Sequence, residues 1–325
     1  MTGLPLEFAR IARHFRPLAG PGALALADDA AVFMPPAGRE LVISADAMVA
    51  GVHFLPDDPP DLVARKLLRT NLSDLAAMGA APLGYLLTVS TPRDQPEAWF
   101  EGFAAGLAQD QAVYGLTLLG GDTTSTPGPV SLSLTILGTV APGHAVRRDG
   151  AQEGHEIWVS GTIGDGALGL LAATGRLADP TGFLADRYRL PQPRLGLAVP
   201  GLVGACLDIS DGLVQDLGHL CRASGVAAEI MAAAVPRSDA ARSAGDAHLL
   251  LSLTGGDDYE LLMTVAPGNA AAFQRHAAGL GVAVSRIGAM IPGSTPALAG
   301  AGVRVIGPHG PMTIETPGWN HFAVR

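Results

Sequence analysis

The sequence predicts a mixed α/β (α+β) fold arranged in two domains. With 325 residues, the chain exceeds the ~250–300 residues at which a single hydrophobic core stops growing. Apolar, β-branched runs alternate with segments of helical periodicity in both halves of the chain. A polar, turn-rich stretch at 141–156 separates the two halves. We therefore expect an N-terminal domain over residues 1–147 and a C-terminal domain over residues 148–325.

The first half is predicted to combine a mixed sheet with long helices. Residues 40–54 begin as a β-branched, apolar run, which predicts a strand that carries Asp46 near its end. Residues 61–82 have helical periodicity and place Asn71 and Asp74 on one face. The other expected elements are strands at 83–90, 116–122 and 130–140 and a helix at 96–115.

The second half repeats this alternation of strands and helices. Its expected elements are a strand at 157–161, helices near 165–175, near 194–205 and at 213–224, and strands near 226–231 and after 257. The similar motifs "LLGGD" (118–122) and "LTGGD" (253–257) suggest an ancient duplication, but five residues do not establish one.

Composition excludes several classes of protein. The chain is 48% apolar and 16% charged with 42 glycines, which is typical of a compact chain with many turns. Its net charge of −9 repels polyanions, so no nucleic-acid partner is expected. The single lysine, Lys66, does not follow a Gly-rich loop, so a Walker A phosphate site is excluded. Any phosphate ligand must be bound without a basic surface.

The cysteines and the N-terminal residues predict a cytoplasmic protein. The two cysteines, Cys206 and Cys221, have neither zinc-ribbon nor CxxC spacing and are expected to be buried thiols in a reducing compartment. Residues 1–15 lack the pattern of a signal peptide. Because no stretch approaches ~18 uninterrupted apolar residues, no membrane span is expected.

Aspartates beside small residues are the most informative feature of the sequence. They are Asp28, Asp29, Asp46, Asp74, Asp122, Asp208, Asp211, Asp257 and Asp258. Helix capping or turn formation is an alternative role for Asp28, Asp58 and Asp211, because a carboxylate accepts local backbone N–H bonds. Capping does not explain Asp46 or Asp74, because a buried, unpaired charge costs several kcal/mol. These two residues therefore need a cationic partner.

A divalent cation is the partner that this composition favours. Mg²⁺ prefers oxygen ligands and commonly joins protein carboxylates to substrate phosphates. Glycines at 120–121 and 255–256 would let backbone N–H groups approach phosphate oxygens. A glycosidase site is a weaker explanation of the aspartates, because aromatic residues that could stack on a sugar are only 5% of the chain. The sequence contains neither the EF-hand spacing nor an HExxH motif.

The motifs together closely resemble the thiamine-monophosphate kinase family. They are "DDAAV" (28–32), "ISADAMVAGVHF" (43–54), "RTNLSDLAAMGAAP" (69–82), "GGDTT" (120–124), "SGTIGDGALGL" (160–170), "DISDGLVQDLGHL" (208–220), "GGDDYEL" (255–261) and "GWNHF" (318–322). Because the match runs in order across nearly the whole chain, it is more specific than any single motif.

The resemblance implies a fold and a reaction. The implied fold is the two-domain aminoimidazole ribonucleotide synthetase-like fold, with an N-terminal mixed sheet that pairs in a homodimer and a C-terminal α/β domain. ATP would lie in a cleft between subunits. The implied reaction is Mg²⁺-dependent, in-line transfer of the ATP γ-phosphoryl group to thiamine monophosphate, which gives thiamine diphosphate and ADP.

The resemblance also implies roles for residues at matching positions. The implied metal ligands are Asp29, Ser44, Ala45, Asp46, Asp74, Asp122, Asp208 and Asp211. The implied ATP contacts are Tyr114, Gly121, Asp122, Arg148 and Ser210. The implied contacts to thiamine phosphate are His53, Asp257 and Trp319, although capping of a C-terminal apolar patch is an alternative for Trp319. No general base is assigned, because the acceptor is already an anionic phosphate.

Three positions depart from the family's usual residues. Ala27 stands in place of a glycine before the acidic pair, which stiffens that loop. Ala45 replaces a threonine, and little is lost if the metal contact at this position uses the backbone carbonyl. Asp257 replaces a glutamate and reaches less far toward the substrate.

The expected mechanism depends on positioning and charge neutralisation. Asp46, Asp74 and Asp122 would hold ions that bridge the ATP phosphates, and Asp208 and Asp211 would bring the second domain to the same metals. Arg148 would add a charge-assisted contact, and Trp319 a flat face for the thiazolium or pyrimidine ring.

Two other functions remain open from the sequence. A sister enzyme of the superfamily could act on a different acceptor. Selenophosphate synthetase is disfavoured because its reactive Cys or Sec and its lysine near the N-terminus have no counterpart here. The hydrogenase-maturation relative is disfavoured because its C-terminal cysteine is missing from the closing residues "HFAVR". A non-catalytic nucleotide sensor would keep the aspartates and bind Mg-ATP without turnover.

Overall fold

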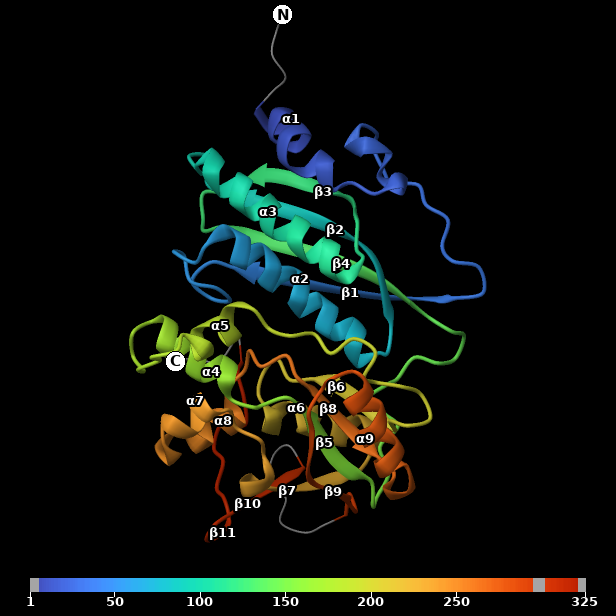
Figure 1. Cartoon of the computed structure of the whole chain (residues 1–325), viewed down its shortest axis with the longest axis vertical. Helices are drawn as coiled ribbons and strands as arrows, with labels where there is room; N and C mark the ends of the chain where they lie inside the picture. Colours follow the sequence, from blue (N-terminus) through green and yellow to red (C-terminus); the bar gives the residue numbers. More distant parts are fainter. Residues whose placement is uncertain (1–5, 295–301, 321–325) are drawn as a thin grey trace, which may run out of the picture. The chain divides into compact units, whose positions relative to one another are not determined.

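A computed structural model describes residues 6–294 and 302–320 of the chain. The chain forms two compact units (Figure 1). The first unit comprises Met1–Leu75 and Ala80–Gly143, and the second comprises Ala76–Gly79 and His144–Arg325. Within the described ranges, no helix combines the length and the apolar character that a membrane crossing requires.

The first unit contains the predicted mixed sheet. Its strands are β1 (Glu40–Val49), β2 (Ala81–Thr91), β3 (Leu118–Ser125) and β4 (Ser131–Val140), and its helices are α1 (Leu6–Arg10), α2 (Pro60–Ala77) and α3 (Glu97–Tyr114). The strand order is β1-β4-β2-β3. β2 and β3 run parallel, whereas the β1–β4 and β4–β2 pairs are antiparallel.

Helices α2 and α3 cover one face of this sheet (Figure 1). Leu132, Leu134 and Ile136 alternate along β4 and are buried, as expected for a strand with one covered face. α2 approaches β4 closely, because a Cβ on Gly138 would lie 2.9 Å from a methyl group of Leu75. This packing places the C-terminal end of α2 against β4.

The other face of the sheet exposes apolar side chains. Ile43 of β1 is 60% exposed, and Leu41 and Leu86 are each 41% exposed. Leu41, Ile43 and Ala45 alternate along β1 and therefore point to the same face. Ala45 pairs with Thr135 of β4, and Thr135 pairs with Leu86 of β2, so Leu86 points to that face as well. We call the surface of Leu41, Ile43 and Leu86 the open face.

The second unit is built on a larger mixed sheet of order β11-β10-β7-β9-β5-β8-β6. Its strands are β5 (Glu156–Ser160), β6 (Ala205–Asp208), β7 (Ala227–Met231), β8 (Leu261–Val265), β9 (Val284–Ile291), β10 (Val303–Gly307) and β11 (Gly310–Pro311). Its helices are α4 (Asp165–Ala173), α5 (Phe183–Arg189), α6 (Leu213–Ser224), α7 (Asp239–Ser243), α8 (Leu249–Thr254) and α9 (Ala270–Gly279).

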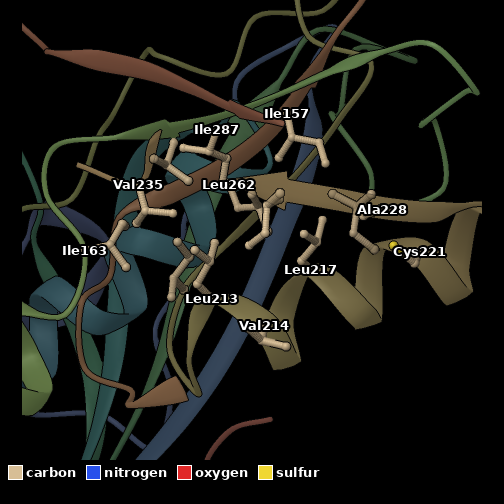
Figure 2. Packing of buried hydrophobic residues seen from close by; sticks show 14 of the residues in the cluster. Ile157, Ile163, Leu213, Val214, Leu217, Cys221, Ala228, Val235, Leu262 and Ile287 are labelled. Carbon is tan, nitrogen blue, oxygen red and sulfur yellow. The ribbon is translucent and has the colours of Figure 1, made fainter. Parts of the chain in front are cut away.

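The central strands of this sheet are apolar on both sides. On one side, Leu213 and Leu217 of α6 pack in a cluster with Ile157 and Leu262 (Figure 2). On the other side, Trp158 packs edge-to-face on Phe273 of α9 at 5.7 Å between ring centroids. Because side chains alternate along a strand, β5 and β8 supply both clusters. β6 also contributes side chains to both clusters, so packing on both sides holds the strand that ends at Asp208.

The predicted helix near 194–205 is wrong. No helix lies in that range, which consists of turns and coil before β6. Pro200 cannot donate a backbone hydrogen bond, and Gly196 and Gly201 have φ values of 79° and 85°, which an α-helix does not accept. A short helix, α5, lies earlier, at Phe183–Arg189.

The two Gly-Gly-Asp motifs have different structures. Gly120–Asp122 lies inside strand β3. Gly255–Asp257 instead follows helix α8 and forms a loop, in which Asp257 has a φ of 72°. Their similarity in sequence therefore does not correspond to a repeated element.

Candidate functional site

Three of the expected metal ligands lie between β1 and α2. The Ser44 hydroxyl donates a hydrogen bond of 2.6 Å to Oδ2 of Asp74. The pKa of Asp46 is raised to about 6, first by burial and then by the charge of Asp74. Two neighbouring carboxylates in a partly buried place repel each other unless a proton or a cation intervenes. We call Ser44, Asp46 and Asp74 the β1–α2 cluster.

Two other expected metal ligands line a cavity in the first unit. Its volume is about 740 Å³, within the ~300–1,000 Å³ range of small-molecule sites. Its lining includes Asp29 from the N-terminal segment and Gly121 and Asp122 of β3. Phe8 and Phe33 contribute apolar surface. The cavity therefore combines carboxylates with an apolar lining.

The strand register places these two groups on opposite faces of the sheet. Asp46 pairs with Leu134, Leu134 with Leu87, and Leu87 with Gly121. Asp122 is the next residue along β3, so its side chain points to the other face from that of Asp46. Three strand spacings of ~4.8 Å also put them about 14 Å apart. One ion cannot bind both, so the structure does not bring Asp122 to the β1–α2 cluster.

Gly121 is required by a close approach of two strands. A Cβ at this position would lie 1.7 Å from the carbonyl oxygen of Leu87 on β2. Any side chain would therefore push β3 away from β2. The glycine keeps Asp122 at the cavity wall.

The remaining expected residues of the first unit are His53 and Tyr114, near the ends of elements, and Ala45, inside β1. His53 follows β1, and its Nδ1 accepts a hydrogen bond of 3.0 Å from the Val49 backbone N–H. The Nζ of Lys66 donates to the His53 carbonyl oxygen at 3.0 Å. Tyr114 ends α3, and its ring centroid lies 5.7 Å from Cζ of Arg69. Ala45 of β1 has its side chain on the open face, so it could offer a metal only its backbone.

The second unit brings four expected residues together after β6. The backbone N–H of Asp257 donates to the carbonyl oxygen of Ser210 at 2.9 Å, and that of Tyr259 donates to Ile209 at 2.8 Å. This pairing continues the β6–β8 ladder beyond Asp208. A Cβ on Gly256 would lie 2.2 Å from the Ser210 oxygen, so only glycine fits. The segment Asp208–Asp211 and the loop of Asp257 thus form one edge.

Asp211 also contacts the C-terminal segment and helix α6. The backbone N–H of Trp319 donates to the Asp211 carbonyl oxygen at 2.9 Å. The carboxylate of Asp216 accepts hydrogen bonds from the N–H groups of Asp211 and Gly212, at 3.0 and 3.1 Å. Ligand atoms of Asp211, Asp216 and His219 lie within 4.8 Å of one another. Asp216 therefore orders the turn that carries Asp211.

Arg148 lies near the same helix. Its carbonyl oxygen accepts a hydrogen bond of 2.8 Å from Ser224 at the end of α6. The pKa of His219 is lowered, first by burial and then by the charges of Arg222 and Arg148. Arg148 thus faces the side of α6 that carries His219.

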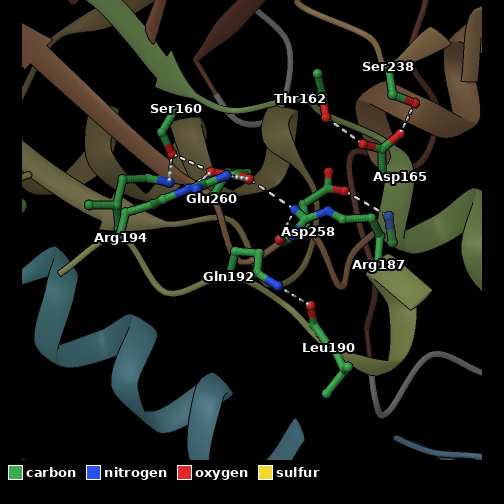
Figure 3. Close-up of polar contacts among 12 residues, drawn as sticks. Ser160, Thr162, Asp165, Arg187, Leu190, Gln192, Arg194, Ser238, Asp258 and Glu260 are labelled. Carbon is green, nitrogen blue, oxygen red and sulfur yellow. Dashed lines mark hydrogen bonds and ion pairs between the residues drawn. The ribbon is translucent and has the colours of Figure 1, made fainter. Parts of the chain in front are cut away.

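A buried polar network supports the loop that carries Asp257 (Figure 3). Glu260 accepts hydrogen bonds from Arg187 at 2.9 Å, from Arg194 at 2.5 and 2.6 Å, and from Ser160 at 2.6 Å. Two residues earlier, the Asp258 carboxyl accepts the N–H groups of Gly164 and Gly166 at 2.7 and 2.9 Å. Burial raises the pKa of Asp258 to about 8, although these two N–H groups lower it.

Asp216, Glu260, Arg187 and Arg194 were not among the expected site residues. Asp216 carries a local signal, because it lies four residues after Gly212 in the first turn of a helix. No local sequence pattern points to Arg187 or Arg194, because they lie 73 and 66 residues from Glu260 and meet it only in the folded chain. Asp216 holds the turn that carries Asp211, and Glu260 with its two arginines anchors the segment that follows Asp257.

Comparisons with known proteins match both units. The family model "AIR synthase related protein, N-terminal domain" matches residues 27–140, and "AIR synthase related protein, C-terminal domain" matches residues 152–300. A thiamine-monophosphate kinase from Caulobacter vibrioides is 47% identical over 299 residues, which are 89% of this chain and 85% of the relative.

Solved structures share the fold over most of the chain. The thiamine-monophosphate kinase from Stenotrophomonas maltophilia K279a is 39% identical, with a TM-score of 0.78 over 92% of this chain and 93% of that one. A structure described as "AaThiL complexed with AMPPCP and TMP" is 29% identical, with a TM-score of 0.75 over 91% of both chains. The matched chain in that complex binds an ATP analogue and TMP together.

Proposed function

Because this chain belongs to the thiamine-monophosphate kinase family, within the AIR synthase-related proteins, we propose that it phosphorylates thiamine monophosphate with ATP. The products are thiamine diphosphate and ADP. The observation that carries this function is the 47% identity to a thiamine-monophosphate kinase over 89% of the chain. The related complex with AMPPCP and TMP supports both substrates.

The residues of the first unit fit Mg²⁺ as the partner of ATP. Ser44, Asp46 and Asp74 offer oxygen atoms only, which are the donors that Mg²⁺ prefers. Burial first, and then the charge of Asp74, raises the pKa of Asp46, and a bound cation would offset both effects by favouring the ionised carboxylate. When bound, Mg²⁺ neutralises negative charge on the phosphates during transfer.

The separation of the two carboxylate groups supports more than one metal position. Asp46 and Asp74 would hold one position, and Asp29 and Asp122 would hold another at the cavity. The N–H groups beside Gly121 would contact a phosphate of ATP, since this backbone carries no side chain to block it. In the second unit, Asp208 and Asp211 would supply further ligands, and Ser210 and Arg148 would contact ATP.

The acceptor would be held by aromatic and polar groups. Trp319 offers an exposed ring to the thiazolium or pyrimidine of thiamine phosphate, worth roughly 0.5–2 kcal/mol. His53 and Asp257 would orient the substrate, so that its phosphate oxygen lies in line with the γ-phosphorus. The acceptor oxygen is already ionised, so these residues need to position it and not to remove a proton.

The open face supports a homodimer. Leu41 and Ile43 expose apolar surface on β1, which is an edge strand of the sheet. Exposed apolar patches on a sheet are typical of protein–protein interfaces. Ile43→Asp is expected to shift the protein from dimer to monomer in sedimentation at micromolar concentration. A wild-type protein that sediments as a monomer contradicts the dimer.

We also place the enzyme in the cytoplasm. Cys206 and Cys221 are both buried free thiols, which a reducing compartment maintains.

The function is tested by incubating the protein with ATP and thiamine monophosphate and separating the products. We expect thiamine diphosphate and ADP in equal amounts, and no product when EDTA removes divalent metal. ADP without thiamine diphosphate would indicate another acceptor. Binding of Mg-ATP without any ADP would indicate a nucleotide sensor.

A further inference from the structure

The first turn of α6 and the C-terminal segment are joined through their backbones. The N–H of Gln215 donates to the carbonyl oxygen of Pro317 at 3.1 Å. The N–H of Trp319 donates to the carbonyl oxygen of Asp211 at 2.9 Å. Gly318 lies between them, and a Cβ there would be 2.5 Å from Cβ of Gln215. The segment therefore lies directly on the start of the helix.

The side chain of Gln215 adds a second connection. Its Nε2 donates to Oδ2 of Asp211 at 3.0 Å and to the carbonyl oxygen of Trp319 at 2.8 Å. An amide nitrogen has two hydrogens, so both are used. One side chain thus joins the carboxylate of Asp211 to the backbone of Trp319.

The two residues it joins have different roles in the proposed function. Asp211 is a proposed metal ligand, whereas Trp319 is a proposed contact for thiamine phosphate. Trp319 as a whole is 39% exposed, while its backbone N–H and its carbonyl oxygen are both hydrogen-bonded to this turn. The position of the ring therefore depends on the backbone that Gln215 holds.

We propose that Gln215 is a positioning residue that couples the metal ligand Asp211 to the substrate contact Trp319. This inference rests on the proposed function. With the Gln215 amide in place, one Asp211 oxygen is oriented and the backbone of Trp319 is fixed relative to it. Ordering of the turn by metal binding then favours the ring position that binds thiamine phosphate.

Two substitutions separate shape from hydrogen bonding. Gln215→Met keeps the length of the side chain but cannot donate a hydrogen bond. Gln215→Glu keeps the shape but places a second carboxylate beside Asp211, which repels it. Gln274→Met is the matched control, because Gln274 lies exposed on α9 of the same unit.

The first readout is hydrogen–deuterium exchange of the full-length protein without ligands. In Gln215→Met, amides of residues 313–320 should exchange about tenfold faster, because the loss of two hydrogen bonds costs on the order of 1 kcal/mol or more. Gln274→Met should leave them unchanged. Unchanged exchange in Gln215→Met overturns the proposal.

The second readout is steady-state kinetics with thiamine monophosphate varied. Gln215→Met should raise KM for thiamine monophosphate about 5- to 10-fold and raise the Mg²⁺ concentration for half-maximal rate. The kcat at saturating substrate and metal should change less than about twofold. Gln215→Glu should raise the Mg²⁺ requirement less than Gln215→Met does, because its added carboxylate attracts the cation, but it should raise KM for thiamine monophosphate at least as much, because a carboxylate cannot donate to the Trp319 carbonyl oxygen.

A double-mutant cycle with Trp319→Ala tests the coupling itself. In that background, Gln215→Met should raise KM by less than about twofold, because the ring it positions is gone. An equal rise in KM with and without Trp319 overturns the proposal. If the wild type makes no thiamine diphosphate, the proposed function fails and this inference fails with it, whereas wild-type turnover with an unchanged KM in Gln215→Met overturns only the role of Gln215.

Discussion

The hydroxyl group of Ser44 on β1 donates a 2.6 Å hydrogen bond to Oδ2 of Asp74 on α2. This bond joins two elements that are 30 residues apart in sequence. It uses the hydrogen of Ser44 and one oxygen of Asp74, which leaves lone pairs on both groups for a cation. The relationship makes the strand and the helix parts of one ligand set.

Ser44→Ala should therefore weaken metal binding without unfolding the protein. The substitution removes one ligand oxygen and frees the Asp74 side chain, so the Mg²⁺ concentration for half-maximal rate should rise about 10-fold. Ser90→Ala, at a half-buried position of β2, is the matched control and should leave it unchanged. A metal requirement that is equal in both variants would exclude Ser44 from the site.

Asp46→Asn should stabilise the protein in EDTA. The pKa of Asp46 is raised to about 6, so at pH 7.5 its ionised form destabilises the metal-free fold. Removal of this charge should raise the free energy of unfolding by about 1 kcal/mol. Thermal unfolding with and without Mg²⁺ checks this, and the wild type should gain more stability from the metal than the variant does. A variant that is less stable than the wild type in EDTA contradicts the explanation.

Gly121→Ala should be far more damaging than Gly120→Ala. A Cβ at Gly121 would lie 1.7 Å from the Leu87 carbonyl oxygen, whereas one at Gly120 would lie 3.4 Å from a methyl group of Leu86. We expect a loss of about 3 kcal/mol or more for Gly121→Ala and under about 1 kcal/mol for Gly120→Ala. Denaturant unfolding of the two variants measures the difference. Equal losses would mean that the close approach of β3 to β2 does not constrain the fold.

Asp258 should make the protein less stable as pH rises. Its folded pKa of about 8 lies above the ordinary value of 3.8, so the native state holds a proton that the unfolded state releases. This contribution is complete below about pH 4 and is lost as pH rises through about 8. Asp258→Asn should remove it and flatten the decline between pH 5 and 8 by up to about 1.4 kcal/mol per pH unit.

The control for that titration is Asp94→Asn, at an exposed turn of the first unit. Its pH profile should match that of the wild type. At pH 5, where the wild-type carboxyl is protonated in the folded state, loss of one acceptor oxygen should also lower the stability of Asp258→Asn by about 1–3 kcal/mol, and this difference should shrink as pH rises. A wild-type profile that is as flat as that of Asp258→Asn would contradict a raised pKa.

Long elements with strong periodicity could be predicted from the sequence. α2 was expected over 61–82 and spans Pro60–Ala77, because its apolar spacing is regular and Gly79 ends the segment with a φ of 68°. Short helices could not be predicted. α5 and α8 have seven and six residues, which is too short for a periodic signal, and tertiary packing decides them.

The site could be predicted in its residue types but not in its geometry. Asp46 and Asp74 could be selected because a buried carboxylate needs a partner. The face of the sheet to which Asp122 points could not be predicted from the sequence. The β2–β3 register shifts between Tyr85 and Leu86, and a one-residue shift moves every later side chain of the strand to the other face. The support of Glu260 by Arg187 also depends on the fold alone.

The most direct test of the central claim is the rate of thiamine diphosphate formation from ATP and thiamine monophosphate as Mg²⁺ is titrated. Wild type, Asp74→Asn and Asp122→Asn are compared, with Asp94→Asn as the control. The account predicts a Mg²⁺-dependent rate in wild type and control, and a loss of at least about 100-fold in both other variants while they remain folded. Undiminished, Mg²⁺-dependent formation of thiamine diphosphate by both variants would contradict it.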